Sequence, residues 1–103
     1  MSEAEVLRQI RLGLNAPGRV FWRNNVGVAE FPSGERVAYG VGGPGGSDLL
    51  GIVDGHFVAI EVKSARGRLT AEQKRFIDLV RRCGGRAGEA RSVEDAIRIA
   101  LGE

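Results

Sequence analysis

Residues 48–63 read DLLGIVDGHFVAIEVK, two short apolar runs joined by Asp54-Gly55. Short runs rich in β-branched and apolar side chains predict strands, and an Asp-Gly dipeptide between two such runs predicts a two-residue turn. We therefore expect an antiparallel hairpin with strands over 48–53 and 56–63. Its open end carries three ionisable residues, Asp48, Glu61 and Lys63.

These three residues have the chemistry of a metal-dependent phosphodiesterase. Glu61 and Lys63 are two positions apart, so the period of a strand places both side chains on one face. Two carboxylates that meet in an apolar setting raise each other's pKa unless a cation lies between them. Carboxylate oxygens are ligands for Mg²⁺ or Mn²⁺, and a nearby ammonium can orient an attacking water. The ordinary alternative is that Asp48 caps a turn while Glu61 and Lys63 form a solvated pair.

The other elements follow from periodicity, caps and turn residues. A glycine-rich segment, GVGGPGG at 40–46, is too rich in glycine for a regular element and predicts a loop that is either mobile or tightly shaped. The order of elements is helix, three or more strands, helix, strand, helix, which describes an α/β domain with one mixed sheet flanked by helices. The expected segments are a helix at 2–14, a strand at 19–24, strands within 26–40 around a tip at Pro32-Ser33-Gly34, a helix from Thr70 to Gly84-Gly85, a strand at 86–90 and a helix from Ser92.

Composition limits the class of protein. A chain of 103 residues, 43% hydrophobic and 27% charged, is typical of one globular domain over residues 1–103. No apolar stretch approaches the roughly 20 residues of a membrane span, and MSEAEVLRQI does not have the pattern of a signal peptide. Cys83 is the only cysteine, which suits a reducing cytoplasm and leaves no cysteine-based metal site.

The basic residues are unevenly distributed between the two types. The net charge is only +2, but thirteen of the fifteen basic residues are arginine. The planar guanidinium binds phosphate oxygens in a bidentate way that lysine does not reproduce, so a nucleic-acid partner is plausible. A GC-rich genome, which favours arginine codons, is the competing explanation.

The stretch GGPGGSDLLGIVDGHFVAIEVKSARGRLTAEQKRF, followed downstream by GGRAGEARSVEDA, resembles the VRR-NUC domain. This is the virus-type replication-repair nuclease branch of the PD-(D/E)XK superfamily, and the resemblance covers about residues 3 to 98. It implies a restriction-endonuclease-like α/β fold of order αβββαβα and metal-dependent DNA cleavage. Stand-alone copies are similar to phage and bacterial enzymes that act on branched DNA as dimers, and members fused to larger proteins act in DNA repair.

The resemblance also implies roles for individual residues. Lys63 would be the catalytic lysine, and Gln73 would face the active site from its helix. The family has a glutamate on the N-terminal helix, for which Glu3 and Glu5 are candidates; we choose Glu3, which shares an apolar stripe with Val6 and Ile10. The initial Pro-Asp of the superfamily is Ser47-Asp48 here, which removes no ligand. The implied ligands of Mg²⁺ or Mn²⁺ are therefore Glu3, Asp48, Glu61 and the carbonyl of Val62.

DNA contacts and assembly are further expectations. Arg23 and Asn24 end a predicted strand, where either could reach a phosphate or border the site. Arg66 and Arg68 flank Gly67 beyond the catalytic strand, so all four are candidates for DNA binding. The alternatives are a strand that enters a turn and arginines that serve solubility. We expect a homodimer with an apolar patch from 26–40 as a candidate interface. The competing functions are a strict Holliday junction resolvase, an inactive DNA-binding module and a structural α/β protein.

Overall fold

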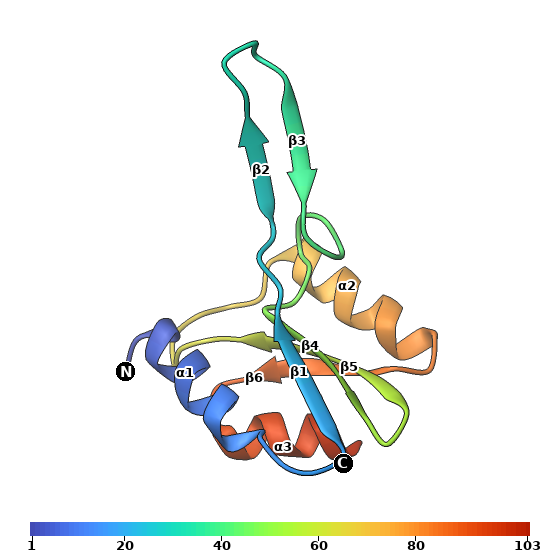
Figure 1. Cartoon of the computed structure of the whole chain (residues 1–103). Helices are drawn as coiled ribbons and strands as arrows, with labels where there is room; N and C mark the ends of the chain where they lie inside the picture. The colour runs from blue at the N-terminus through green and yellow to red at the C-terminus, as the bar shows by residue number, and fades with distance from the viewer.

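The computed structural model describes all 103 residues, Met1–Glu103 (Figure 1). No helix in it combines the length and the apolar composition that a membrane crossing needs. The elements are, in chain order, α1 (Glu3–Gly13), β1 (Arg19–Arg23), β2 (Gly27–Glu30), β3 (Arg36–Tyr39), β4 (Leu49–Val53), β5 (His56–Val62), α2 (Ala71–Arg82), β6 (Arg86–Ala90) and α3 (Val93–Leu101).

The main sheet has four strands in the order β1-β4-β5-β6. β4 pairs antiparallel with both β1 and β5, whereas β5 and β6 are parallel, so the sheet is mixed as expected. The turn between β4 and β5 consists of Asp54 and Gly55, both at positive φ (51° and 80°), which is the geometry that a two-residue hairpin requires. The predicted hairpin over residues 48–63 is confirmed.

Helices cover both faces of this sheet (Figure 1). α1 and α3 pack on one face and α2 packs on the other, so the sheet is the middle layer. The side chain of Thr70 accepts a hydrogen bond from the backbone of Gln73, and the side chain of Gln73 accepts one from the backbone of Thr70, which closes the start of α2. The buried residues of the larger core cluster are Val6, Ile10, Leu14, Leu49, Val53, Val58, Ile60, Val62, Ala90, Ala96 and Ala100.

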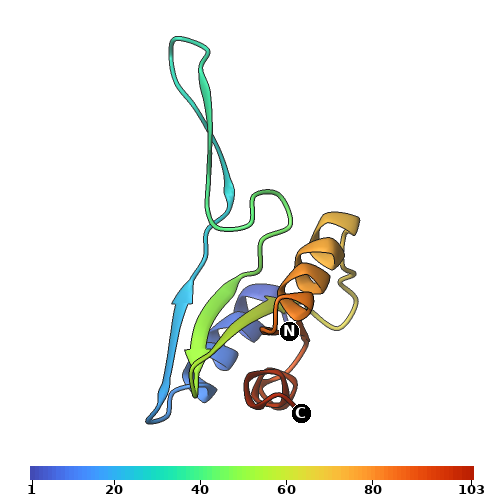
Figure 2. The same cartoon turned by 90° about the vertical axis from the view of Figure 1, so that its right-hand side faces the viewer.

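The segment 26–40 departs from the prediction of a single sheet. β2 and β3 pair only with each other, and Figures 1 and 2 show this hairpin projecting away from the helices and the main sheet. One further hydrogen bond, from the backbone of Asn24 to the carbonyl of Asp48, extends the β1–β4 contact beyond Arg23. The chain then leaves the sheet, and β2 begins at Gly27. The hairpin therefore exposes large apolar side chains, which are Val28, Phe31, Val37 and Tyr39.

The glycine-rich loop is tightly shaped rather than loosely attached. A Cβ added at Gly42 would lie 2.5 Å from the ring of Phe76, and one added at Gly45 would lie 2.5 Å from the carbonyl of Glu72. Both glycines also have φ near +90° to +100°, which other residues rarely adopt. Glycine is required here because the loop backbone lies directly against α2.

Candidate active site

Three carboxylates meet at one end of the main sheet. Glu3, Asp48 and Glu61 each offer an oxygen, and these oxygens all lie within 4.8 Å of one another. Glu3 is exposed, Asp48 is half-buried, and Glu61 is only 2% exposed. The cluster therefore combines three separate elements of the chain, which are the start of α1, the residue before β4 and the end of β5.

The register of the strands and the packing of α1 explain this convergence. Leu49 pairs with Ile60 across the β4–β5 ladder, so the next residue out on each strand is Asp48 on one side and Glu61 on the other. Val6 and Ile10 anchor α1 in the core, and Glu3 lies one turn before Val6 on the same stripe. Glu3 joins the cluster and Glu5 does not, which agrees with the choice made from the stripe.

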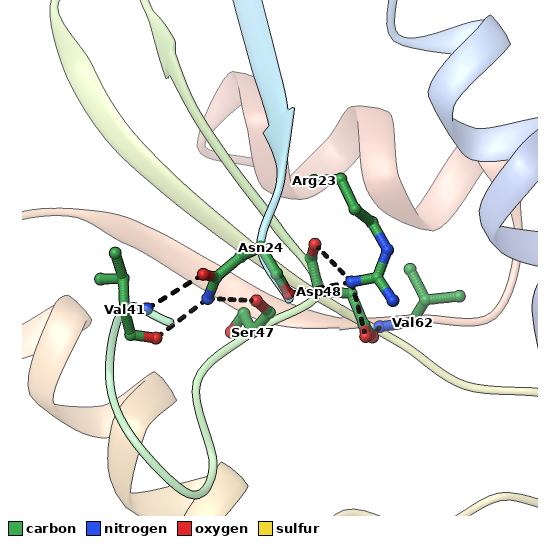
Figure 3. Close-up of polar contacts among 6 residues, drawn as sticks. All are labelled: Arg23, Asn24, Val41, Ser47, Asp48 and Val62. Carbon is green, nitrogen blue, oxygen red and sulfur yellow. Dashed lines mark hydrogen bonds and ion pairs between the residues drawn. The ribbon is translucent and has the colours of Figure 1, made fainter. Parts of the chain in front are cut away.

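The Asp48 carboxylate is held by two neighbours (Figure 3). Its Oδ2 accepts a hydrogen bond of 2.8 Å from the backbone N–H of Val62. Its Oδ1 lies 3.5 Å from Nη1 of Arg23, and the same Nη1 donates to the backbone carbonyl of Asp48 at 3.1 Å. These contacts fix the orientation of the carboxylate at the edge of the cluster.

Glu61 is the most perturbed acid of the protein. Desolvation by burial, together with a hydrogen bond to Asp48 and the negative charges of Asp48 and Glu3, raises the pKa of Glu61 from an ordinary 4.5 to about 9, against an opposing effect of Lys63. At neutral pH and without a cation, this carboxyl group therefore retains its proton. A bound cation would reverse the balance, because it stabilises the charged form of every carboxylate around it.

The donor set fits a divalent cation of the Mg²⁺ type. Such ions prefer oxygen ligands, which usually include one or more carboxylates. The three carboxylates here, of which Glu61 is desolvated, need a nearby positive charge for all three to ionise. Glu3, Asp48 and Val62 also border one small pocket of about 190 Å³. Glu3, Asp48 and Glu61 are the residues whose carboxylates could hold such an ion together.

Lys63 follows the cluster on the same strand. Its backbone N–H donates to the carbonyl of Ala90, which extends the β5–β6 ladder by one residue, and the residue is only 8% exposed. It forms no ion pair within 4.0 Å. A Cβ at Gly67 would lie 3.3 Å from Cδ of Lys63, so Gly67 leaves room for the lysine stem. The positive charge of the ammonium lowers the pKa of Glu61, although the two side chains do not form an ion pair.

The three carboxylates also line a larger pocket of about 500 Å³. Gln73 lines it, and its Oε1 accepts a hydrogen bond of 2.9 Å from the backbone of Thr70, which leaves its NH₂ group as the free donor. The base of the β2–β3 hairpin and the glycine-rich loop form other walls, through residues that include Val28, Ala38, Gly45 and Gly46. None of these wall residues carries an ionisable group. The position of the loop directly before Asp48 pointed to Gly45 and Gly46 in the sequence, whereas no feature of the sequence pointed to Val28 and Ala38.

The four predicted DNA contacts are in different environments. Arg23 lines the large pocket, and Arg66 and Arg68 are exposed in the turn after β5. Asn24 also lines the large pocket, but it is 9% exposed, and both hydrogens of its side-chain amide are donated to carbonyls of the protein. Asn24 therefore borders the site, one of the two roles expected for it, but no hydrogen of its side-chain amide remains for the other, a phosphate contact.

Comparison with known proteins identifies one family. The model of the VRR-NUC domain matches residues 33–94. The matched region contains Asp48, Glu61, Lys63 and Gln73, whereas Glu3 lies outside it. A search of curated proteins finds no match.

Proposed function

This chain belongs to the VRR-NUC family of nucleases, and we propose that it is a Mg²⁺- or Mn²⁺-dependent endonuclease that hydrolyses phosphodiester bonds in branched DNA. The observation that supports this proposal most directly is the meeting of Glu3, Asp48 and Glu61 within 4.8 Å. The cluster lies beside the buried and unpaired Lys63. A structural role alone does not account for a desolvated acid among two other acids.

The residues of the site have different roles in the proposed hydrolysis. Glu3, Asp48, Glu61 and the Val62 carbonyl would hold the divalent ion, which when bound would supply Lewis-acid activation of a water and neutralise charge on the scissile phosphate. The Asp48 carboxylate is already oriented by the N–H of Val62. Lys63 stabilises negative charge that develops on the phosphate, and the free NH₂ of Gln73 helps to orient the attacking water.

The DNA backbone would approach the site past three arginines. Arg23 lines the pocket itself, and Arg66 and Arg68 are exposed on the turn that follows Lys63. Guanidinium groups in these places can contact phosphates on both sides of the bond to be cut. Affinity that rests on such contacts falls steeply as salt concentration rises.

The β2–β3 hairpin supports the proposal of a homodimer. An isolated two-stranded hairpin is marginally stable in water, and this one leaves apolar side chains of both strands exposed. Its charged residues are two acids and one arginine, namely Glu30, Glu35 and Arg36, so it is a poor surface for phosphates. Pairing of two hairpins across a twofold axis would bury the apolar side chains and bring two active sites to one branched substrate. A monomer in sedimentation at micromolar concentration, with or without DNA, would exclude this assembly.

Cleavage of a labelled four-way junction and of the matching linear duplex tests the nuclease proposal. The assay compares Mg²⁺, Mn²⁺ and EDTA for the wild type, for Lys63→Ala and for Lys74→Ala, which removes the only other lysine from the exposed face of α2. We expect metal-dependent cutting that Lys63→Ala slows by about 100-fold or more, with little effect of Lys74→Ala.

Three other outcomes have distinct meanings. When flaps and forks are added to the substrates, metal-dependent cutting of four-way junctions alone indicates a strict Holliday junction resolvase. Binding to the junction without cutting by the folded wild type indicates an inactive binding module and contradicts the proposed chemistry. Equal cutting of junction and duplex contradicts the preference for branched DNA while it supports the nuclease.

A further inference from the structure

Asn24 connects the end of β1 to the glycine-rich loop (Figure 3). Its Nδ2 donates to the carbonyls of Val41 and Ser47, each at 2.9 Å, and its Oδ1 accepts from the N–H of Val41 at 3.0 Å. The side chain thus contacts both ends of the segment 41–47. All three bonds cross between segments at least 17 residues apart in the chain.

The same residue is tied to the metal site through the backbone. The N–H of Asn24 donates to the carbonyl of Asp48 at 2.8 Å, and Ser47, whose carbonyl receives the Asn24 amide, is fully buried. Asn24 therefore contacts the two residues that lead into β4, one of which is a proposed metal ligand. The loop that it closes forms a wall of the pocket around the carboxylates through Pro44, Gly45 and Gly46.

We propose that Asn24 is a positioning residue, which latches the loop 41–47 across the metal site and so holds both Asp48 and the pocket wall in place. This inference rests on the proposed nuclease function. A segment with five glycines among residues 40–46 loses much conformational freedom when it is ordered, so it needs specific bonds to keep one shape. The amide of Asn24 provides them at both ends of the loop.

A positioning role for Asn24 and a role in DNA binding predict different experimental results. A residue that binds phosphate affects the affinity for DNA and its salt dependence, while the metal site stays intact. A residue that positions Asp48 affects metal affinity and kcat, because small displacements of a ligand reduce the rate strongly. The two roles can therefore be separated in one set of variants.

The first readout needs neither metal nor DNA. We would measure amide hydrogen exchange by NMR in the wild type, in Asn24→Ala and in Asn25→Ala, which truncates the exposed neighbouring asparagine in the same way. In the wild type, the Val41 amide should be protected and the Gly43 amide, which donates no hydrogen bond, should exchange freely. Asn24→Ala should accelerate exchange at Val41 by about tenfold or more, whereas Asn25→Ala should not. If the Val41 amide exchanges freely in the wild type, the proposed role of Asn24 is overturned, even if Asn24→Ala does not fold.

The second readout concerns the site. In Asn24→Ala we expect Mn²⁺ affinity, measured by calorimetry, to fall about tenfold, and kcat to fall about ten- to a hundredfold. The Kd for a four-way junction in Ca²⁺ should change by less than about twofold. A loss of junction affinity with unchanged kcat and Mn²⁺ affinity overturns the proposal in favour of a DNA contact. If the wild type does not cut DNA at all, the nuclease proposal fails, while the exchange and Mn²⁺ measurements still decide whether Asn24 latches the loop.

Discussion

Substitution of Glu61 by glutamine should change how the stability of the metal-free protein depends on pH. The folded-state pKa of about 9 lies well above the ordinary value of 4.5. Between these two values the folded protein keeps a proton that the unfolded chain releases, so the free energy of unfolding falls as pH rises. One retained proton corresponds to about 1.4 kcal/mol per pH unit, and thus to a loss of about 3 kcal/mol between pH 6 and pH 8. Glutamine has a similar shape and does not titrate in this range.

Urea unfolding in EDTA at pH 6, 7 and 8 measures this contribution. We expect the wild type to lose about 3 kcal/mol more than Glu61→Gln over this range, with equal m-values. Glu35→Gln, at the exposed tip of the β2–β3 hairpin, serves as the control and should follow the wild type. If the wild type and Glu61→Gln lose stability in parallel, Glu61 does not hold a proton in the folded protein and the argument from burial is refuted.

Three further predictions concern the ion, the core and the cap. Because a cation must displace the proton of Glu61, Mn²⁺ affinity should rise by up to about tenfold per pH unit below pH 9; calorimetry that shows no proton release at pH 7 would contradict this. Ile60→Ala, at a fully buried position, should lower the free energy of unfolding by about 2–5 kcal/mol, and a change under 1 kcal/mol in urea unfolding would argue against the observed core. Thr70→Ala should cost about 1 kcal/mol, since the capping box of α2 is lost; an unchanged thermal midpoint would show that the cap contributes nothing.

The local features of the fold could be predicted from the sequence because each depends on neighbouring residues. Asp54-Gly55 specifies a two-residue turn, and a two-residue turn sets the register of β4 and β5. The register in turn places Asp48 beside Glu61. The Thr70–Gln73 capping box likewise depends on residues three positions apart. The residues by which the nuclease family is identified also lie close together in the sequence, since the family model matches one continuous stretch, residues 33–94.

Other features depended on contacts between distant parts of the chain. Asn24 follows a strand in the sequence like many residues that enter a turn, and its burial arises only when the loop 41–47 folds over it. The separation of the β2–β3 hairpin from the main sheet also could not be predicted, since its strands have the same apolar character as strands inside a sheet.

The carboxylate cluster shows both contributions. The sequence by itself determined which acids share one hairpin, because a strand has a period of two and a tight turn has a defined register. The stripe of α1 favoured Glu3 over Glu5, but only the packing of α1 on the sheet brings the Glu3 oxygen within 4.8 Å of Asp48 and Glu61. The burial that raises the pKa of Glu61 also exists only in the folded protein, because desolvation is a property of the surroundings and not of the residue.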